Sequence, residues 1–175
     1  MKKPKDFSGE PLEIERKFLI VRPEKAQLEQ YSTGRIDMEQ IYLLRREKGE
    51  SRRIRRSQMA GETRYYYNEK VRLSSIKRIE REWEITREEY VGLTAQADPA
   101  CQIIRKVRWL VPAGELTLEV DVFPFWRHQA FCEAELTHEA QPVELPGWME
   151  LLREVTDDDA YTNHALARSI PWEEG

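Results

Sequence analysis

Strict alternation of charged and apolar side chains is the feature that most constrains how this chain can fold. Residues 13–20 read EIERKFLI, so Glu13, Glu15 and Lys17 recur at every second position. Because successive side chains of a β-strand point to opposite faces, the segment predicts a strand with one charged and one apolar face. Two carboxylates in line gain nothing from each other in water, so the pattern requires a cationic partner among them.

The same alternation returns along the chain and predicts a mainly antiparallel β fold. Eight strands are expected, near residues 12–21, 38–46, 51–57, 63–73, 79–86, 102–111, 115–123 and 129–138. Turn signals that join successive strands as hairpins lie at residues 48–50, 60–62 and 112–114. Helices are expected at residues 23–31, 87–97, 148–155 and 161–169.

Length and composition limit the number of domains and the class of protein. The 175 residues suit one domain, so residues 11–175 are expected to form a single unit after a loose leader, residues 1–10. The net charge of -4 lacks the basic excess that non-specific nucleic-acid binding needs. No apolar run suits a membrane span or a signal core. We therefore expect a cytoplasmic protein that binds neither nucleic acid nor membrane.

The charged faces of the predicted strands carry acids on some strands and bases on others. One such strand, taken alone, most often has a solvated face, but an ordinary wet face mixes both signs with Ser and Thr. Eight strands closed with their apolar faces outward, under helices, would bring the charged faces into one interior. The charged positions are Glu13, Glu15, Glu80, Glu82, Glu84, Glu119, Asp121, Glu133 and Glu135, and Lys17, Arg53, Arg55, Lys70, Arg72, Lys106 and Arg108.

An interior of this kind implies a charged ligand, because uncompensated buried charges are costly. Arginine forks and lysine ammonium groups suit a string of phosphates. Carboxylates suit Mg²⁺ or Mn²⁺, which are hard ions that share phosphate oxygens as further ligands. The residues therefore predict a site for a divalent metal and a polyphosphate.

In this ordered set of motifs the chain resembles the CYTH superfamily, also called the triphosphate tunnel metalloenzymes. The family signature is a Glu-x-Glu-x-Lys strand near the N-terminus, here Glu13 to Lys17, and the resemblance runs nearly to the end of the chain. It implies an α+β fold, a closed eight-stranded antiparallel tunnel with helices packed outside. The other matching segments are Arg53-x-Arg55, Lys70, REWEI at 81–85, Lys106-x-Arg108, LEVDVF at 118–123 and AFCEAEL at 130–136.

The resemblance also implies roles for individual residues. Glu82 and Glu84 are assigned to catalysis, with a structural salt bridge as an equal alternative. In SRRIRRS the inward pair is taken as Arg53 and Arg55, and Arg52 and Arg56 on the opposite face are the alternative. The implied metal ligands are Glu13, Glu15, Glu119, Asp121, Glu133 and Glu135, with Asp121 and Glu119 at a second ion that activates water. The implied phosphate-binding residues are Lys17, Arg53, Arg55, Lys70, Lys106 and Arg108, and the implied catalytic residues are Lys17, Arg55, Asp121, Glu82 and Glu84.

The expected activity is metal-dependent hydrolysis of a linear triphosphate. The C-terminal segment REVTDDDAYTNHALA is similar to that of compact bacterial members, which favours inorganic tripolyphosphate as the substrate and pyrophosphate and phosphate as the products. Three alternatives stay open: a class IV adenylate cyclase that converts ATP to cyclic AMP, a thiamine triphosphatase, and a non-catalytic polyphosphate-binding module. Either a monomer or a homodimer is compatible with the sequence.

Overall fold

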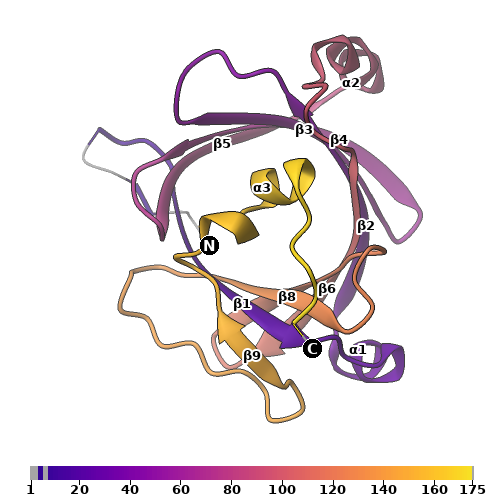
Figure 1. The fold of residues 1–175 in the computed structure, drawn as a ribbon, viewed down its shortest axis with the longest axis vertical. Coiled ribbons are helices and arrows are strands. Elements are labelled where there is room, and N and C mark those ends of the chain that lie inside the picture. The colour runs from indigo at the N-terminus through magenta and orange to yellow at the C-terminus, as the bar shows by residue number, and fades with distance from the viewer. Residues whose placement is uncertain (1–3, 6–7, 175) are drawn as a thin grey trace.

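The computed structural model describes residues 4–5 and 8–174 (Figure 1). The strands are β1 (Leu12–Val21), β2 (Gly34–Leu43), β3 (Glu50–Met59), β4 (Glu62–Arg72), β5 (Lys77–Ile85), β6 (Ile104–Ala113), β7 (Leu116–Val122), β8 (Gln129–Glu135) and β9 (Leu151–Glu154). The helices are α1 (Lys25–Tyr31), α2 (Arg87–Leu93) and α3 (Asn163–Arg168), with 3-10 turns η1 (Thr94–Gln96) and η2 (Asp159–Tyr161). Each helix in this part of the chain is too short or too polar to span a membrane.

Eight of the strands close into an antiparallel barrel, as predicted. The order is β5-β4-β3-β2-β6-β7-β8-β1, and β1 returns to β5 through residues 12–14. The rest of β1 pairs with β8 on one edge, and residues 18–20 also pair with β9 on the other edge. The seam between β1 and β5 is therefore short, because β9 takes over the edge of β1 that β5 leaves.

The hairpin between β3 and β4 shows how local sequence sets the register. Its two-residue loop is Ala60-Gly61, with φ of 49° and 83°. Positive φ at both central residues gives a type I′ turn, whose twist matches that of the flanking strands, and glycine adopts this conformation without strain. The turn fixes Met59 opposite Glu62 and so sets the facing of every later pair of β3 and β4.

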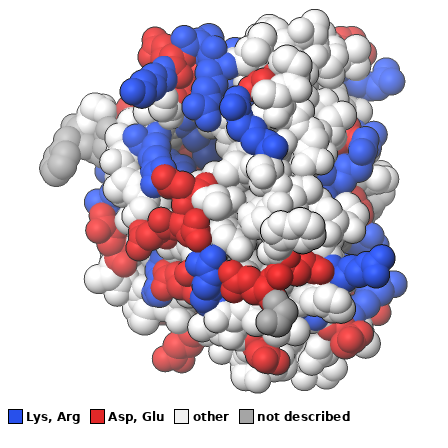
Figure 2. All heavy atoms as spheres, viewed as in Figure 1, with Lys and Arg blue, Asp and Glu red and all other residues white. Residues whose placement is uncertain are grey.

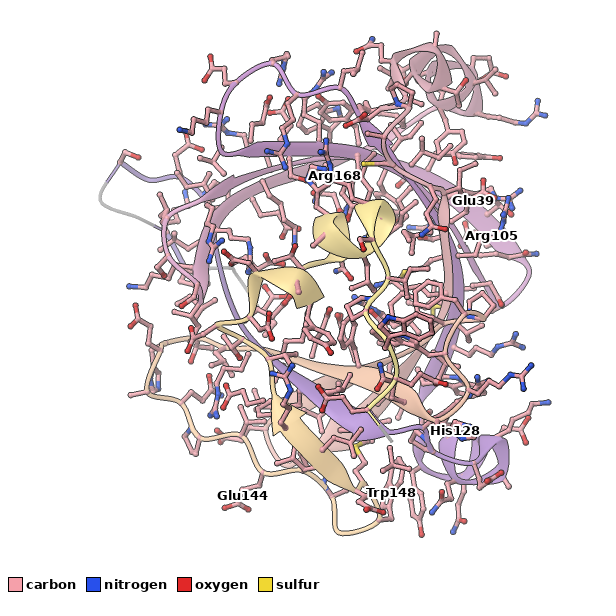
Figure 3. The ribbon with its side chains drawn as sticks, viewed as in Figure 1. Glu39, Arg105, His128, Glu144, Trp148 and Arg168 are labelled. Atoms are coloured by element: carbon pink, nitrogen blue, oxygen red, sulfur yellow. The ribbon has the colours of Figure 1, made fainter. Side chains whose placement is uncertain are left out.

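The apolar faces of the strands point outward and are covered in two places. Phe18, Val120 and Cys132 lie in a buried cluster with Leu28 of α1 and Met149 of the segment after β8. Beside this cluster Tyr31 of α1 stacks on Trp148, with ring centroids 4.9 Å apart (Figure 3). Burying each large side chain contributes roughly 1.5–3 kcal/mol to stability.

The second covered patch lies under α2. Ile54 of β3 and Tyr67 of β4 pack against Tyr90, the buried residue of that helix. Nearby positions on the outer face are charged and pair in solvent, as Glu39 and Arg105 do at 3.0 Å (Figure 3). The helices expected outside the barrel are thus α1 and α2.

The C-terminal segment fills one end of the barrel with apolar side chains. A second buried cluster contains Leu19 of β1, Phe131 of β8 and Phe123, which directly follows β7. Tyr161 of η2 and Leu166 of α3 complete it. In Figure 1, α3 lies within the ring of strands, unlike α1 and α2. We call this cluster the apolar end. Its presence means that the interior is charged over only part of its length.

The helix predicted at residues 148–155 is wrong, because residues 151–154 form β9. Their backbone pairs with β1, where Phe18 and Leu19 would otherwise present unpaired peptide groups along an edge. Pairing with a distant strand therefore overrides the helical preference of the local sequence.

The leader predicted at residues 1–10 is only partly described. Residues 1–3, 6 and 7 lie outside the described residues. Of the rest, the Pro4 carbonyl accepts a hydrogen bond from the Leu12 amide at 2.8 Å, and Lys5 forms a β-bridge with Pro11. These contacts connect the start of the described chain to β1.

Candidate functional site

The strand registers bring the predicted charged residues together on the inner face of the barrel. Arg108 of β6 lies opposite Asp121 of β7, and Glu133 of β8 lies opposite Lys17 of β1. On the other side of the barrel Lys70 of β4 lies opposite Glu80 of β5. At these three pairs a base faces an acid across a strand boundary, whereas Glu119 of β7 lies opposite Glu133 of β8.

One network joins β1, β6, β7 and β8. Arg108 Nε donates to Asp121 Oδ1 at 2.7 Å, and Arg108 Nη2 donates to Glu133 Oε2 at 2.8 Å. Lys17 Nζ lies 3.0 Å from Glu133 Oε1, while Lys106 also contacts Asp121. Asp121 is fully buried, and Glu119 closes the group through a further ion pair with Arg108. Five predicted site residues thus converge around one arginine.

A second network joins β1, β4 and β5. Lys70 Nζ donates to both oxygens of Glu13 at 2.7 and 2.8 Å and lies 3.4 Å from Glu80. Asn68 Nδ2 donates to Glu80 at 2.9 Å and to Glu82 at 3.0 Å. The sequence placed Glu80 on the acidic face and Asn68 in phase with Lys70, but it assigned neither of them a role in the site.

The register of SRRIRRS places Arg53 and Arg55 inside. Arg55 donates to Glu82 at 3.0 Å, but the Nε groups of both arginines are buried and have no hydrogen-bond partner among the described residues. Arg52 instead packs on the outer face, where its Nε donates to the Tyr67 hydroxyl at 2.7 Å. Buried guanidinium donors without an acceptor are costly, and an anionic ligand would satisfy them.

Three of the predicted site residues are not buried with the others. Glu82 and Glu84 of β5 and Glu135 of β8 are all exposed. Glu135 lies opposite Glu15 across the pairing of β1 with β8. The structure thus brings the charged set together in the barrel with these three carboxylates at its solvent-exposed margin.

The carboxylates differ in proton affinity because their neighbours differ. Burial, with the like charges of Glu133 and Glu13, raises the pKa of Glu15 to about 7. Burial alone would also raise the pKa of Glu133, but Lys17 and Arg108 together hold it well below its usual value. Glu15 is therefore the carboxylate with the greatest need of a further cation.

The basic groups also differ from one another. Burial, with the neighbouring charge of Arg108, lowers the pKa of Lys106 to about 8, although Asp121 acts in the opposite direction. Burial opposes the charge of Lys70, but Glu13 and Glu80 raise its pKa above the usual value. Lys70 therefore keeps its full charge at neutral pH, whereas Lys106 lies close to titration.

The donor set fits a hard divalent ion in chemistry. Glu15, Glu119, Asp121 and Glu133 offer carboxylate oxygens of the kind that Mg²⁺ and Mn²⁺ prefer, and the raised pKa of Glu15 reflects crowded negative charge that a cation would relieve. Among the described residues, however, the predicted carboxylates do not form a group of three with oxygens within 4.8 Å of one another. Here Lys17, Lys70 and the inner arginines hold these carboxylates in ion pairs.

A different trio does meet that distance. Asp98, Cys101 and His164 offer ligand atoms within 4.8 Å of each other. Arg168 donates to Asp98 at 2.9 Å, and Arg45 Nη2 lies 3.0 Å from His164 Nδ1. Two guanidinium groups already in contact with the trio make it a poor site for a cation.

Two solved structures resemble this chain in fold over most of its length. No family model matches the sequence, and no curated protein matches it. The crystal structure of the inorganic triphosphatase NE1496 aligns over 91% of this chain and 97% of its own, with a TM-score of 0.55 and 27% identity. PH1819 from Pyrococcus horikoshii OT3 covers 73% of this chain and 80% of its own, with a TM-score of 0.57 and 17% identity, which shows a shared fold.

Its likeness to this triphosphatase in sequence and fold is consistent with the resemblance to the CYTH superfamily. The strand Glu13 to Lys17, which carries the resemblance, lies with alternate residues inside the barrel, as the resemblance implied. The sequence missed Tyr42 and His164, whose rings stack with centroids 4.7 Å apart beside the inner cations. The alternation of β2 is a signal for Tyr42, but no local pattern places α3 against the barrel interior.

Proposed function

We propose that this chain is a divalent-metal-dependent triphosphatase that hydrolyses inorganic tripolyphosphate to pyrophosphate and phosphate. The observation that carries the proposal is the barrel interior, where Arg53 and Arg55 hold buried donors without acceptors beside paired acids and bases. An inorganic triphosphatase is similar in both sequence and fold over nearly the whole chain. An enzyme acting on triphosphates is the function that these features support best.

The basic residues of the interior would bind the substrate. Phosphate oxygens would accept hydrogen bonds from the guanidinium and ammonium groups. The same cations would stabilise the negative charge that develops on the leaving pyrophosphate. Lys17 and Arg55 are the residues to which we assign this transition-state role. The full phosphate-binding set is Lys17, Arg53, Arg55, Lys70, Lys106 and Arg108.

The acidic residues would hold the metal. When bound, Mg²⁺ or Mn²⁺ supplies polarisation of phosphate oxygens and a more acidic water. Glu82 and Glu84 would orient water and neighbouring cations, and Glu82 already contacts Arg55. The proposed ligands are Glu13, Glu15, Glu133 and Glu135 for one ion and Asp121 and Glu119 for the second.

The ion pairs suggest how binding would rearrange the site. Lys70 is held by Glu13, and Arg108 is held by Asp121 and Glu133. Phosphate oxygens would replace carboxylates as partners of the bases, and this exchange would release the carboxylates to hold metal. The charged residues would thus have partners of opposite sign both with and without substrate, which limits the free-energy cost of burying them.

The test is phosphate release from tripolyphosphate with Mg²⁺ or Mn²⁺, together with thiamine triphosphate and ATP as competing substrates. We expect one phosphate and one pyrophosphate per tripolyphosphate consumed, and no turnover after the metal is removed with EDTA. Cyclic AMP from ATP would point to a cyclase, and tight binding without cleavage to a non-catalytic module. The expected monomer or homodimer, the cytoplasmic location and the absence of nucleic-acid or membrane partners stay predictions.

A further inference from the structure

A cavity of about 250 Å³ at one mouth of the barrel is lined by three basic residues in addition to those assigned to the triphosphate. Two carboxylates line it, Glu15 and Glu50. In the space-filling view, basic side chains gather around a recess at the upper left (Figure 2). The basic residues that line the cavity are Lys17, Arg45, Arg53, Lys70, Arg72 and Arg78.

Arg72 and Arg78 form a pair of like charges directly opposite each other on β4 and β5. Such a pair is destabilising unless an anion lies near it. Asp159 of η2 forms an ion pair with Arg72, with 2.6 Å between Oδ1 and Nη1, and so compensates the charge of Arg72. Glu13 lies opposite Arg78 where β1 pairs with β5, but both of its carboxylate oxygens accept from Lys70. Within residues 4–5 and 8–174, Arg78 has no ion pair with a carboxylate at 4.0 Å or less.

Arg45 is the third basic residue at this mouth. Its Nη2 lies 3.0 Å from His164 Nδ1, and that ring is neutral because burial lowers the pKa of His164 to about 4. The contact therefore does not neutralise Arg45. The ring of His164 is already stacked on Tyr42, which leaves one fewer aromatic face for a nucleobase and favours a ligand made of phosphates.

These residues continue the proposed substrate site outward, since Arg53 and Lys70 line the same cavity. We propose that Arg45, Arg72 and Arg78 form a subsite for the phosphates beyond the third in a linear polyphosphate chain. The inference rests on the proposed function for the position of the first three phosphates. It names a substrate class, longer linear polyphosphates, that the six proposed phosphate-binding residues alone do not specify.

The test compares the binding of tripolyphosphate, tetrapolyphosphate and a long-chain polyphosphate by calorimetric titration without metal, so that hydrolysis does not consume the ligand. In Arg78→Ala we expect tetrapolyphosphate and the long chain to bind about fivefold to tenfold more weakly, because one charge-assisted contact is lost. Tripolyphosphate should change by less than about twofold. Arg78→Lys, which keeps the charge, should retain most of the affinity and also serves if the alanine variant does not fold.

The matched control is Arg81→Ala on the same strand. Arg81 lies on the outer face, where its Nε donates to Glu10 at 3.0 Å, and its loss should change the affinity for none of the three chains. Equal weakening of all three by Arg78→Ala, or no weakening, would overturn the subsite. If wild type binds the chains but releases no phosphate with either metal, the proposed function fails while the binding comparison still decides the subsite.

Discussion

Two regions with opposite chemistry meet on the same inner face of the barrel. On β8, Glu133 and Phe131 lie two positions apart and are 2% and 0% exposed. Glu133 contacts Lys17 and Arg108, whereas Phe131 packs edge-on against Trp126. The change from charged to apolar thus occurs within one step of a strand, with no change in burial.

The two regions show that burial contributes differently to stability depending on whether the buried side chains are charged or apolar. Desolvation offsets most of what the buried ion pairs contribute, so the charged region adds little net stability. The apolar end loses no hydration of charge, so its side chains contribute their full burial energy. We therefore expect substitutions in the apolar end to affect stability and substitutions in the charged region to affect activity.

The largest effect is expected in the apolar end. Phe131→Ala should lower the free energy of unfolding by about 3–5 kcal/mol, because a fully buried ring is lost and a cavity is left. Urea unfolding followed by circular dichroism measures the change. Phe125→Ala, which removes a partly exposed ring 4.9 Å from Phe123, is the matched control and should cost less. Equal costs at the two positions would contradict the proposed role of the apolar end.

In the charged region the second effect should appear in the rate. Asp121→Asn should lower kcat by about 10²–10³-fold, since it removes a charge from the proposed metal and phosphate site. The control is Asp37→Asn, which alters an exposed carboxylate paired with Arg35 on the outer face and should leave kcat unchanged. Turnover of Asp121→Asn within a few-fold of wild type would rule out the proposed role for this residue.

The third effect concerns pH and Glu15. Because its pKa is raised from 4.5 to about 7, the folded state binds this proton more tightly than the unfolded state does. The contribution to stability is present below pH 4.5 and is lost as the pH rises toward 7. Relative to Glu15→Gln, wild type should lose about 3 kcal/mol over this range without metal. Urea unfolding at a series of pH values tests this, and a parallel course of the two proteins would refute it.

The smallest effect is expected from a charge on the outer face. Arg16 lies between Glu15 and Lys17 in sequence but points outward, where its Nε and Nη2 donate to Glu154 at 2.8 and 2.7 Å. Arg16→Ala should cost less than about 1 kcal/mol, because the pair is partly exposed to solvent. Thermal unfolding of this variant beside Lys25→Ala, which breaks an exposed pair on α1, provides the comparison. A cost above that of Phe125→Ala would break the contrast between the two faces.

The sequence predicted the closed antiparallel barrel and the inward direction of its charged residues. Alternation is a local property, so EIERK, REWEI and LEVDV each determine which side chains share a face. Periodicity did not choose between the Arg53 pair and the Arg52 pair, since both alternate equally well. Packing decided it, because Arg52 reaches the Tyr67 hydroxyl on the outer face.

Only the tertiary structure decided which charges meet and how the barrel ends. The pairing of Lys70 with Glu13 depends on the closure of β1 on β5, and residues so far apart in sequence carry no local signal of their register. The helical pattern of residues 148–155 yielded to the open edge of β1, and α3 entered the barrel rather than covering it. Local spacing thus determined the face of each strand, while long-range hydrogen bonding and packing determined what each face contacts.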